Sequence, residues 1–375
     1  MRKMFAVCAL GCVASSVFAQ SSVTVYGVVD INYQYLSSGK NSPLQGNNLQ
    51  RLEDGHKYGG PGSRLGFRAL EDLGDGLTAG AVLEMGIVAD TGGLAQGGRG
   101  FGRQSFVNLS SPTWGEVRLG RQYALHDETM NLTEPFGNTT LLSPGAVNTF
   151  AVGVVPMFID APRIDNMAQY LTPPFAGFRL QAAVAAGEGL VDRYQGLKGT
   201  YSEGKLNVAA SYEWSKARAA TAGVSSAGDT VNKVLELGAN YDFGPFKAFG
   251  GYQQGRSLTP GPSGIVTAPA ATGGVGTQIA SLTLPGLRGP ATDLTAYTAG
   301  ASVDFGLTSV GVNYTRTQYE DRSGADQRLR RVGALALYRF SKRTLVYGGV
   351  GVHNGDLKDY INEKRIVQLG LRHSF

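Results

Sequence analysis

Cysteine is nearly absent from this chain of 375 residues, which contains two, Cys8 and Cys12. A mature chain that starts after them has no disulfide to stabilise it in an oxidising compartment and no thiolate for a metal site. Apolar runs of about 18 residues are also missing after the first 19 positions, so the sequence predicts no transmembrane helix. The mean hydropathy of −0.10 is too polar for a helical membrane protein.

Histidine is scarce as well, with four residues in the whole chain. We expect His56, His126 and His353 in long loops between strands, whereas His373 lies on the apolar face of the last expected strand. No serine is plausibly paired with any of them, so a Ser-His-acid triad is not expected. The sequence therefore predicts no enzyme, no catalytic residue, no metal site and no cofactor.

The first 19 residues have the pattern of a cleaved signal peptide. Arg2 and Lys3 precede an apolar run that ends at the small-residue site Val17-Phe18-Ala19. We expect a signal peptide at residues 1–19 and one mature domain at residues 20–375. An acylated lipoprotein that begins at Cys12 is the alternative reading.

A large excess of one charge is lacking too. The net charge of +5 falls to +3 when Arg2 and Lys3 are removed, because 32 basic and 29 acidic residues then remain. This balance is too small to indicate a nucleic-acid partner.

Glycine and aromatic residues are abundant instead: 54 glycines, 17 tyrosines and 16 phenylalanines. Apolar and polar residues alternate with a period of two in segments of about ten residues. In the first segment, Val23, Val25 and Val29 point one way, whereas Asp30 and Asn32 point the other. Similar alternation occurs at residues 205–215, 235–243 and 297–305. This is the pattern of membrane-spanning β-strands with one lipid face and one water face.

Short and long connections alternate between these segments. We expect seven short turns, at residues 71–76, 110–115, 172–177, 202–204, 243–245, 305–307 and 341–343. We expect eight long loops, at residues 37–61, 88–102, 122–162, 188–195, 217–231, 255–291, 318–328 and 354–363. The sequence therefore predicts an all-β fold, a 16-stranded antiparallel transmembrane barrel with short turns on the periplasmic side and long loops outside.

The chain ends on an aromatic residue. Val367, Leu369, Leu371 and His373 share a face with Phe375 in the expected last strand. A final strand with a C-terminal phenylalanine resembles the membrane insertion signal of bacterial outer-membrane barrels.

Five stretches together resemble the Gram-negative general-diffusion porins, particularly their β-proteobacterial trimeric group. They are residues 22–27, 63–68, 117–122, 338–344 and 370–375. The resemblance runs from end to end and is weakest in the loops. It implies a homotrimer in the outer membrane, in contact with outer-membrane lipid and lipopolysaccharide, with a third loop folded into the lumen. It also implies passive diffusion of small hydrophilic solutes and ions.

The segment 122–162 has the position of that third loop. We expect Asp127, Glu128 and Glu134 to form the acidic side of the pore constriction, because Glu134 begins an acidic Pro/Phe/Gly element that resembles the family's constriction loop. The apolar stretch 147–159 is expected to pack on the barrel wall.

Opposite such a loop the family places basic residues. Leu65 and Phe67 are expected to face lipid, which turns Arg64 and Arg68 inward, and the same alternation turns Arg118 inward. Further candidates for the basic side are Arg103, Arg121, Arg163 and Arg179, which lie near strand ends.

Gln169 stands where relatives often carry arginine, and the loop itself is acidic, so we expect only a weak anion preference. A substrate-specific outer-membrane channel, a barrel-anchored adhesin or receptor, and a secreted β-sandwich remain the alternatives.

Overall fold

The computed structural model describes residues 21–55, 62–136, 143–145, 147–150, 153–159, 163–186, 193–216, 231–258 and 284–375. The expected signal peptide with both cysteines, His56 and most of the expected loop 255–291 lie outside these ranges. Within the described ranges, no helix is long and apolar enough to span a bilayer.

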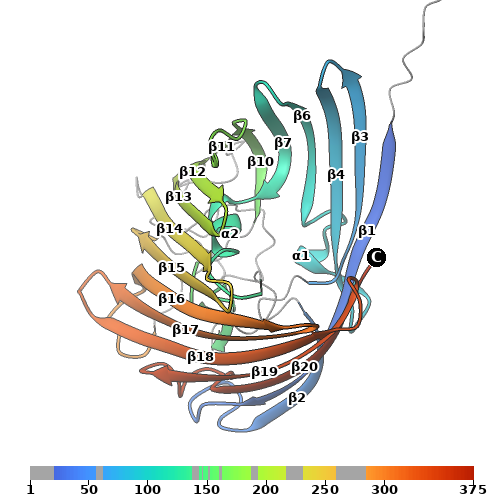
Figure 1. Cartoon of the computed structure of the whole chain (residues 1–375). Helices are drawn as coiled ribbons and strands as arrows, with labels where there is room; N and C mark the ends of the chain where they lie inside the picture. The colour runs from blue at the N-terminus through green and yellow to red at the C-terminus, as the bar shows by residue number, and fades with distance from the viewer. Residues whose placement is uncertain are drawn as a thin grey trace, which may run out of the picture.

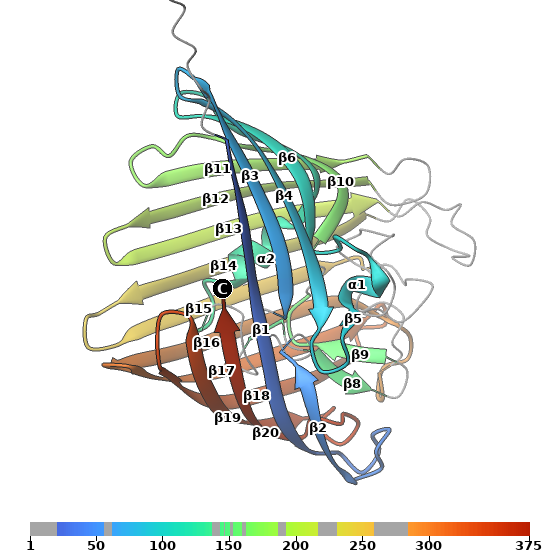
Figure 2. The same cartoon turned by 90° about the vertical axis from the view of Figure 1, so that its right-hand side faces the viewer.

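Antiparallel strands close into a barrel around a central lumen (Figures 1 and 2). The ring closes because the first strand, β1, pairs with the last strand, β20, on one side and with β2 and β3 on the other. The wall consists of β1 (Ser22–Ser37), β2 (Asn48–Asp54), β3 (Arg64–Gly74), β4 (Leu77–Val88), β6 (Gln104–Ser111), β7 (Gly115–Tyr123), β10 (Arg163–Leu171), β11 (Phe178–Ala185), β12 (Arg193–Glu203), β13 (Leu206–Lys216), β14 (Val231–Asp242), β15 (Lys247–Arg256), β16 (Ala291–Phe305), β17 (Thr308–Asp321), β18 (Asp326–Arg339), β19 (Thr344–Gly355) and β20 (Arg365–Ser374).

The expected sixteen wall positions are confirmed, although one of them is divided. β2 pairs with the C-terminal half of β1 and β3 pairs with its N-terminal half, so the two together fill a single position. The short strand β5 (Gly93–Leu94) pairs only with the end of β4, beside the one-turn helix α1 (Ala95–Gly98). Neither of these two elements belongs to the wall.

Side chains alternate between lipid and lumen as the sequence predicts. In β1, Val23 is 70% exposed on the outer face, whereas Asp30 is completely buried on the inner face. In β20, Val367, Leu369 and Leu371 are exposed on the outer face. A barrel wall with water inside and lipid outside requires this period of two.

All seven expected short turns are present at one end of the barrel, but two of the expected long loops are wrong in extent. The expected loop 37–61 contains β2, which is part of the wall. The expected loop 318–328 is a tight turn at residues 322–325, because β17 and β18 continue to its two ends. His353 was expected in a loop but lies in β19, where its side chain is buried.

The C-terminal residue closes the seam of the barrel. The backbone N–H of Phe375 donates to the Gly27 carbonyl, and the N–H of Gly27 donates to the Phe375 carbonyl, both at 3.1 Å. A Cβ at position 27 would lie 2.4 Å from the Phe375 ring, so glycine makes room for the terminal aromatic side chain.

Candidate functional site

The third loop, between β7 and β10, lies inside the barrel (Figures 1 and 2). Its helix α2 (Leu125–Met130) packs against the inner face of β12, β13 and β14. Buried Glu213 of β13 fixes the start of this helix, because it accepts hydrogen bonds from the His126 backbone N–H at 2.7 Å and faces His126 Nδ1 at 2.6 Å. The expected infolding of the third loop is thereby confirmed.

A second part of the loop packs on the next stretch of wall, at β15 to β17. It includes β8 (Val147–Phe150) and β9 (Gly153–Pro156), which pair with each other. Met157, Phe158 and Ile159 are completely buried in the main apolar cluster, so the expected packing of this apolar stretch is confirmed.

Polar groups of the wall hold the same stretch by its backbone. Gln253 of β15 accepts a hydrogen bond from the Ile159 N–H and donates one to its carbonyl. Thr317 and Tyr319 of β17 donate to the carbonyls of Met157 and Pro156, respectively, at 2.5 Å. Because these backbone groups have no partner in a regular sheet, the wall side chains take over that role.

The acidic residues of the loop are engaged with the wall. Glu128 forms an ion pair with Lys198 of β12, with 2.5 Å between Oε2 and Nζ. Glu134 is 1% exposed and accepts a hydrogen bond from the Phe136 N–H, while Arg331 of β18 donates to the Ser143 carbonyl in the same loop. Asp127 is buried as well. The loop therefore presents much less free negative charge to the lumen than its composition suggests.

Arg64 and Arg68 of β3 face the lumen, as the alternation predicts. They pair in register with Val28 and Thr24 of β1, on the same side as Tyr26. The Arg68 guanidinium lies 5.4 Å from the centre of the Tyr26 ring. Within the described ranges, neither arginine has a carboxylate at ion-pair distance.

Arg103 and Arg163 come together beside them, and Arg103 forms an ion pair with buried Glu84. Arg103 Nε lies 2.7 Å from Glu84 Oε1, and the Tyr26 hydroxyl donates to Glu84 Oε2 at 3.0 Å. Arg103 and Arg163 both donate to the Tyr123 hydroxyl. Burial lowers the pKa of Arg103, which lies just before β6, and the positive charges of Arg163 and Arg64 lower it further.

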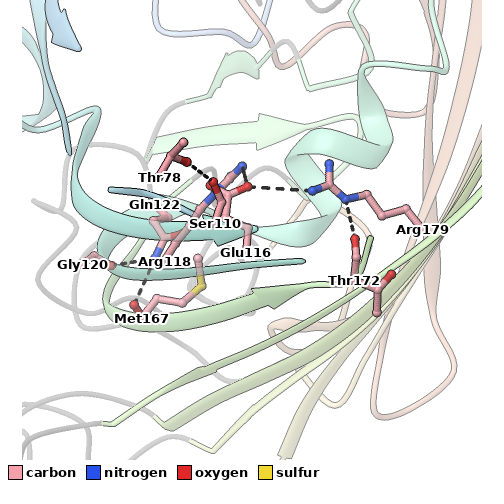
Figure 3. Close-up of polar contacts among 9 residues, drawn as sticks. All are labelled: Thr78, Ser110, Glu116, Arg118, Gly120, Gln122, Met167, Thr172 and Arg179. Carbon is pink, nitrogen blue, oxygen red and sulfur yellow. Dashed lines mark hydrogen bonds and ion pairs between the residues drawn. The ribbon is translucent and has the colours of Figure 1, made fainter. Parts of the chain in front are cut away.

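Arg118 is inward-facing too but lies nearer the short turns, in a separate group (Figure 3). It forms an ion pair with Glu116 two residues before it, with 2.8 Å between Nε and Oε1. Arg179 of β11 lies 3.8 Å from the other Glu116 oxygen and donates to the Thr172 carbonyl. Because two arginines share one carboxylate, this group of three residues carries one net positive charge.

Arg121 is held in a different ion pair, although it lies near enough to Arg163 for their like charges to interact. By alternation Arg121 belongs to the same outward-facing row as Val117 and Leu119. Gly120, directly before it, has a φ of +135°, which distorts the strand. The Arg121 guanidinium binds Asp165 and the Gly102 carbonyl, and Arg99 binds the same Asp165. The structure thus brings Arg64, Arg68, Arg103 and Arg163 together and leaves Arg118 outside that cluster. Arg121 lies at its edge, with its guanidinium paired to Asp165.

Several wall residues that hold this site escaped the sequence analysis. Glu84, Lys198 and Arg331 are each buried on the inner face. Alternation alone shows that Glu84 points inward, because its neighbour Leu83 is exposed on the outer face. No local pattern in the sequence shows which residue each of them contacts.

Glu84→Gln should destabilise the barrel by about 3 kcal/mol, because it leaves the buried Arg103 without its counter-charge. The free energy of unfolding, measured by urea titration in lipid vesicles, checks this. Glu116→Gln is the matched control and should cost less than about 1 kcal/mol, since its partners are partly exposed. Equal losses in the two variants would contradict a special role of Glu84.

Comparisons with known proteins agree on one family. Residues 6–357 match the family described as Gram-negative porin. An outer membrane porin protein of Bordetella pertussis is 28% identical over 408 residues, and outer membrane porin protein 32 of Delftia acidovorans is 29% identical over 400 residues; each alignment covers 100% of both chains. A solved structure titled as an anion-selective porin from Comamonas acidovorans is 26% identical, with a TM-score of 0.69 over 95% of this chain and 100% of that one.

Proposed function

Because the chain belongs to the Gram-negative porin family and forms a passive diffusion channel in the outer membrane, we propose that this channel weakly prefers small anions. The observation that carries the proposal is an imbalance of free charge in the lumen. Arg64 and Arg68 face the lumen without a carboxylate partner within the described ranges, whereas Glu128 is paired with Lys198 of the wall and Glu134 is buried inside the loop. Fixed charge on the rim of a narrow aqueous pore sets its ion preference.

Two further facts support a preference for anions. Arg118 and Arg179 share one carboxylate, so a second net positive charge lies on the path of a solute. The solved porin from Comamonas acidovorans, to which this chain is similar, is titled anion-selective. The preference is expected to be weak because Glu84 neutralises Arg103, and Gln169 adds no charge.

The individual roles follow from this arrangement. We propose that Arg64 and Arg68 form the basic side of the constriction, with Arg103 and Arg163 behind them. Arg118 acts at the periplasmic mouth, whereas the ion pair with Asp165 removes Arg121 from the conduction path. Asp127, Glu128 and Glu134 belong to the loop that narrows the lumen, and they act mainly by holding this loop against the wall.

The remaining expectations are proposals of the same kind. The relatives are channels, and we propose that this protein has no enzymatic activity. We propose a homotrimer of the mature chain 20–375, formed after removal of residues 1–19, with Phe375 as the membrane insertion signal. In the structure Phe375 occupies the seam where the barrel closes.

The purified protein in a planar bilayer should give stepwise conductance, with a reversal potential of the sign set by chloride in a tenfold KCl gradient. Its magnitude should stay well below the about 59 mV of a perfectly selective channel. A reversal potential of the opposite sign would overturn the anion preference and leave the porin assignment intact. Stepwise conductance in groups of three would support the trimer.

A further inference from the structure

Two arginines lie directly opposite each other on the outer face of the barrel. Arg316 of β17 pairs in register with Arg330 of β18. Both belong to the outward-facing rows, which continue toward the short turns with Tyr314, 36% exposed, and Val332, 58% exposed. The pair therefore lies just beyond the last apolar residues of the lipid-facing band, at the level where polar headgroups begin.

Among the residues that the structure describes, none with a carboxylate neutralises this pair. Arg316 donates from Nη1 to the Tyr297 hydroxyl at 2.7 Å and lies 5.6 Å from the centre of that ring. The Nε of Arg330 is buried without a hydrogen-bond partner. Within the described ranges, neither guanidinium has a carboxylate at ion-pair distance.

Neighbouring arginines on the same rim differ in having a carboxylate partner, although the Nε of Arg328 is also buried without a hydrogen-bond partner. Arg328 pairs with Asp326 at 3.1 Å, and Arg256 lies 3.5 Å from Asp293. Like charges directly opposite each other across two strands destabilise the pairing, and an unpaired buried N–H adds to the cost. Such an arrangement is favourable when an anion lies between the two charges.

We propose that Arg316 and Arg330 bind a phosphate group of an outer-leaflet lipid such as lipopolysaccharide. The planar guanidinium groups can each donate two hydrogen bonds to phosphate oxygens. Asn354, which pairs with Arg330, and Gln318 flank the site with neutral polar groups. The apolar surface at Tyr314 and Val332 receives the acyl chains directly below the phosphate.

The neighbouring apolar surface favours a lipid over free phosphate as the source of this group. Inorganic phosphate would gain only the hydrogen bonds, whereas a lipid also buries its chains against the barrel. The acidic residues of the same face, Glu320 and Asp326, lie four positions farther along each strand, toward the extracellular turn.

Arg316→Ala with Arg330→Ala should weaken binding of phosphorylated lipopolysaccharide roughly 30-fold, since each arginine near an anionic surface contributes about 1 kcal/mol. Native mass spectrometry of the folded protein in detergent, titrated with this lipid, measures the change. Arg328→Ala is the matched control and should change binding by less than about threefold, because that arginine already has a partner.

Three comparisons separate the outcomes. Enzymatically dephosphorylated lipopolysaccharide should bind the unmodified protein as weakly as the double variant binds the intact lipid. Unchanged binding by the double variant would overturn the proposal, and so would inorganic phosphate that occupies the site as well as the lipid does. Heat-modifiable migration confirms that each variant is folded, and an unchanged reversal potential distinguishes this outer site from the lumen charges.

Discussion

Arg64→Glu with Arg68→Glu should reverse the ion preference of the channel from anions to cations. The two substitutions change the charge of the lumen by four units at positions where no described carboxylate neutralises the arginines. In a tenfold KCl gradient, the reversal potentials of a non-selective and a perfectly selective channel differ by about 59 mV. The double variant should shift the reversal potential by a large fraction of this difference. Single-channel recordings in planar bilayers measure both this potential and the conductance.

A control with the same charge change separates local from general electrostatics. Lys342→Glu with Arg343→Glu alters an exposed short turn between β18 and β19, outside the lumen. Screening over about 10 Å at 0.1 M salt should leave the reversal potential nearly unchanged in this variant. If the control shifted the potential as much as the lumen variant, or if the lumen variant shifted nothing, Arg64 and Arg68 would not set the preference.

Glu213→Ala should release the third loop from the wall and increase both the conductance and the open-channel noise. The substitution removes the acceptor of two contacts from His126, all within a buried site. Breaking a buried charged contact costs about 3 kcal/mol, which changes the ratio of docked to undocked loop roughly 100-fold. Single-channel traces at fixed voltage show the larger current and its fluctuation.

Two further variants test the cause of this effect. Glu213→Gln retains an oxygen for the His126 N–H, so its conductance should fall between those of the wild type and the alanine variant. Glu203→Ala removes a carboxylate from the exposed end of neighbouring β12, where it contacts Tyr201 and not the loop, and should conduct like the wild type. Equal conductance in all these proteins would show that Glu213 does not hold the loop.

The wall of the barrel is predictable because its environment imposes a local pattern. Lipid on one side and water on the other require alternation in every strand, so the facing of Arg64 and Arg68 follows from Leu65 and Phe67. The pattern fails where both faces are polar. In β2, Arg51 and Glu53 point inward and form an ion pair, while Gln50 on the outer face accepts a hydrogen bond from Tyr33. With polar residues on both faces, the sequence of this segment resembles that of a loop.

The tight turn between β17 and β18 was missed for a related reason. The strand ends around it are charged, with Glu320 and Asp326 beyond the lipid-facing band. The turn itself carries a readable signal, because Asp321 accepts hydrogen bonds from the N–H groups of Ser323 and Ala325. An aspartate that accepts from the backbone two residues later is typical of a turn.

The partners of the third loop could not be predicted from local sequence. His126 and Glu213 are 87 residues apart, and Ser143 and Arg331 are 188 residues apart. No periodicity connects such positions, since their contact depends on the curvature and closure of the whole barrel. The resemblance to known porins supplied the infolded loop, but which wall groups hold it became visible only in the structure.

These long separations also set an order for biogenesis. Thr149 of the loop binds Glu363, 214 residues later and just before β20. Contacts of this range form slowly, because the intervening chain must be in place first. We therefore expect the loop to complete its contacts only once the residues just before the last strand are in place. A change in the last hairpin that removes the Glu363 contact should also loosen the loop that narrows the pore.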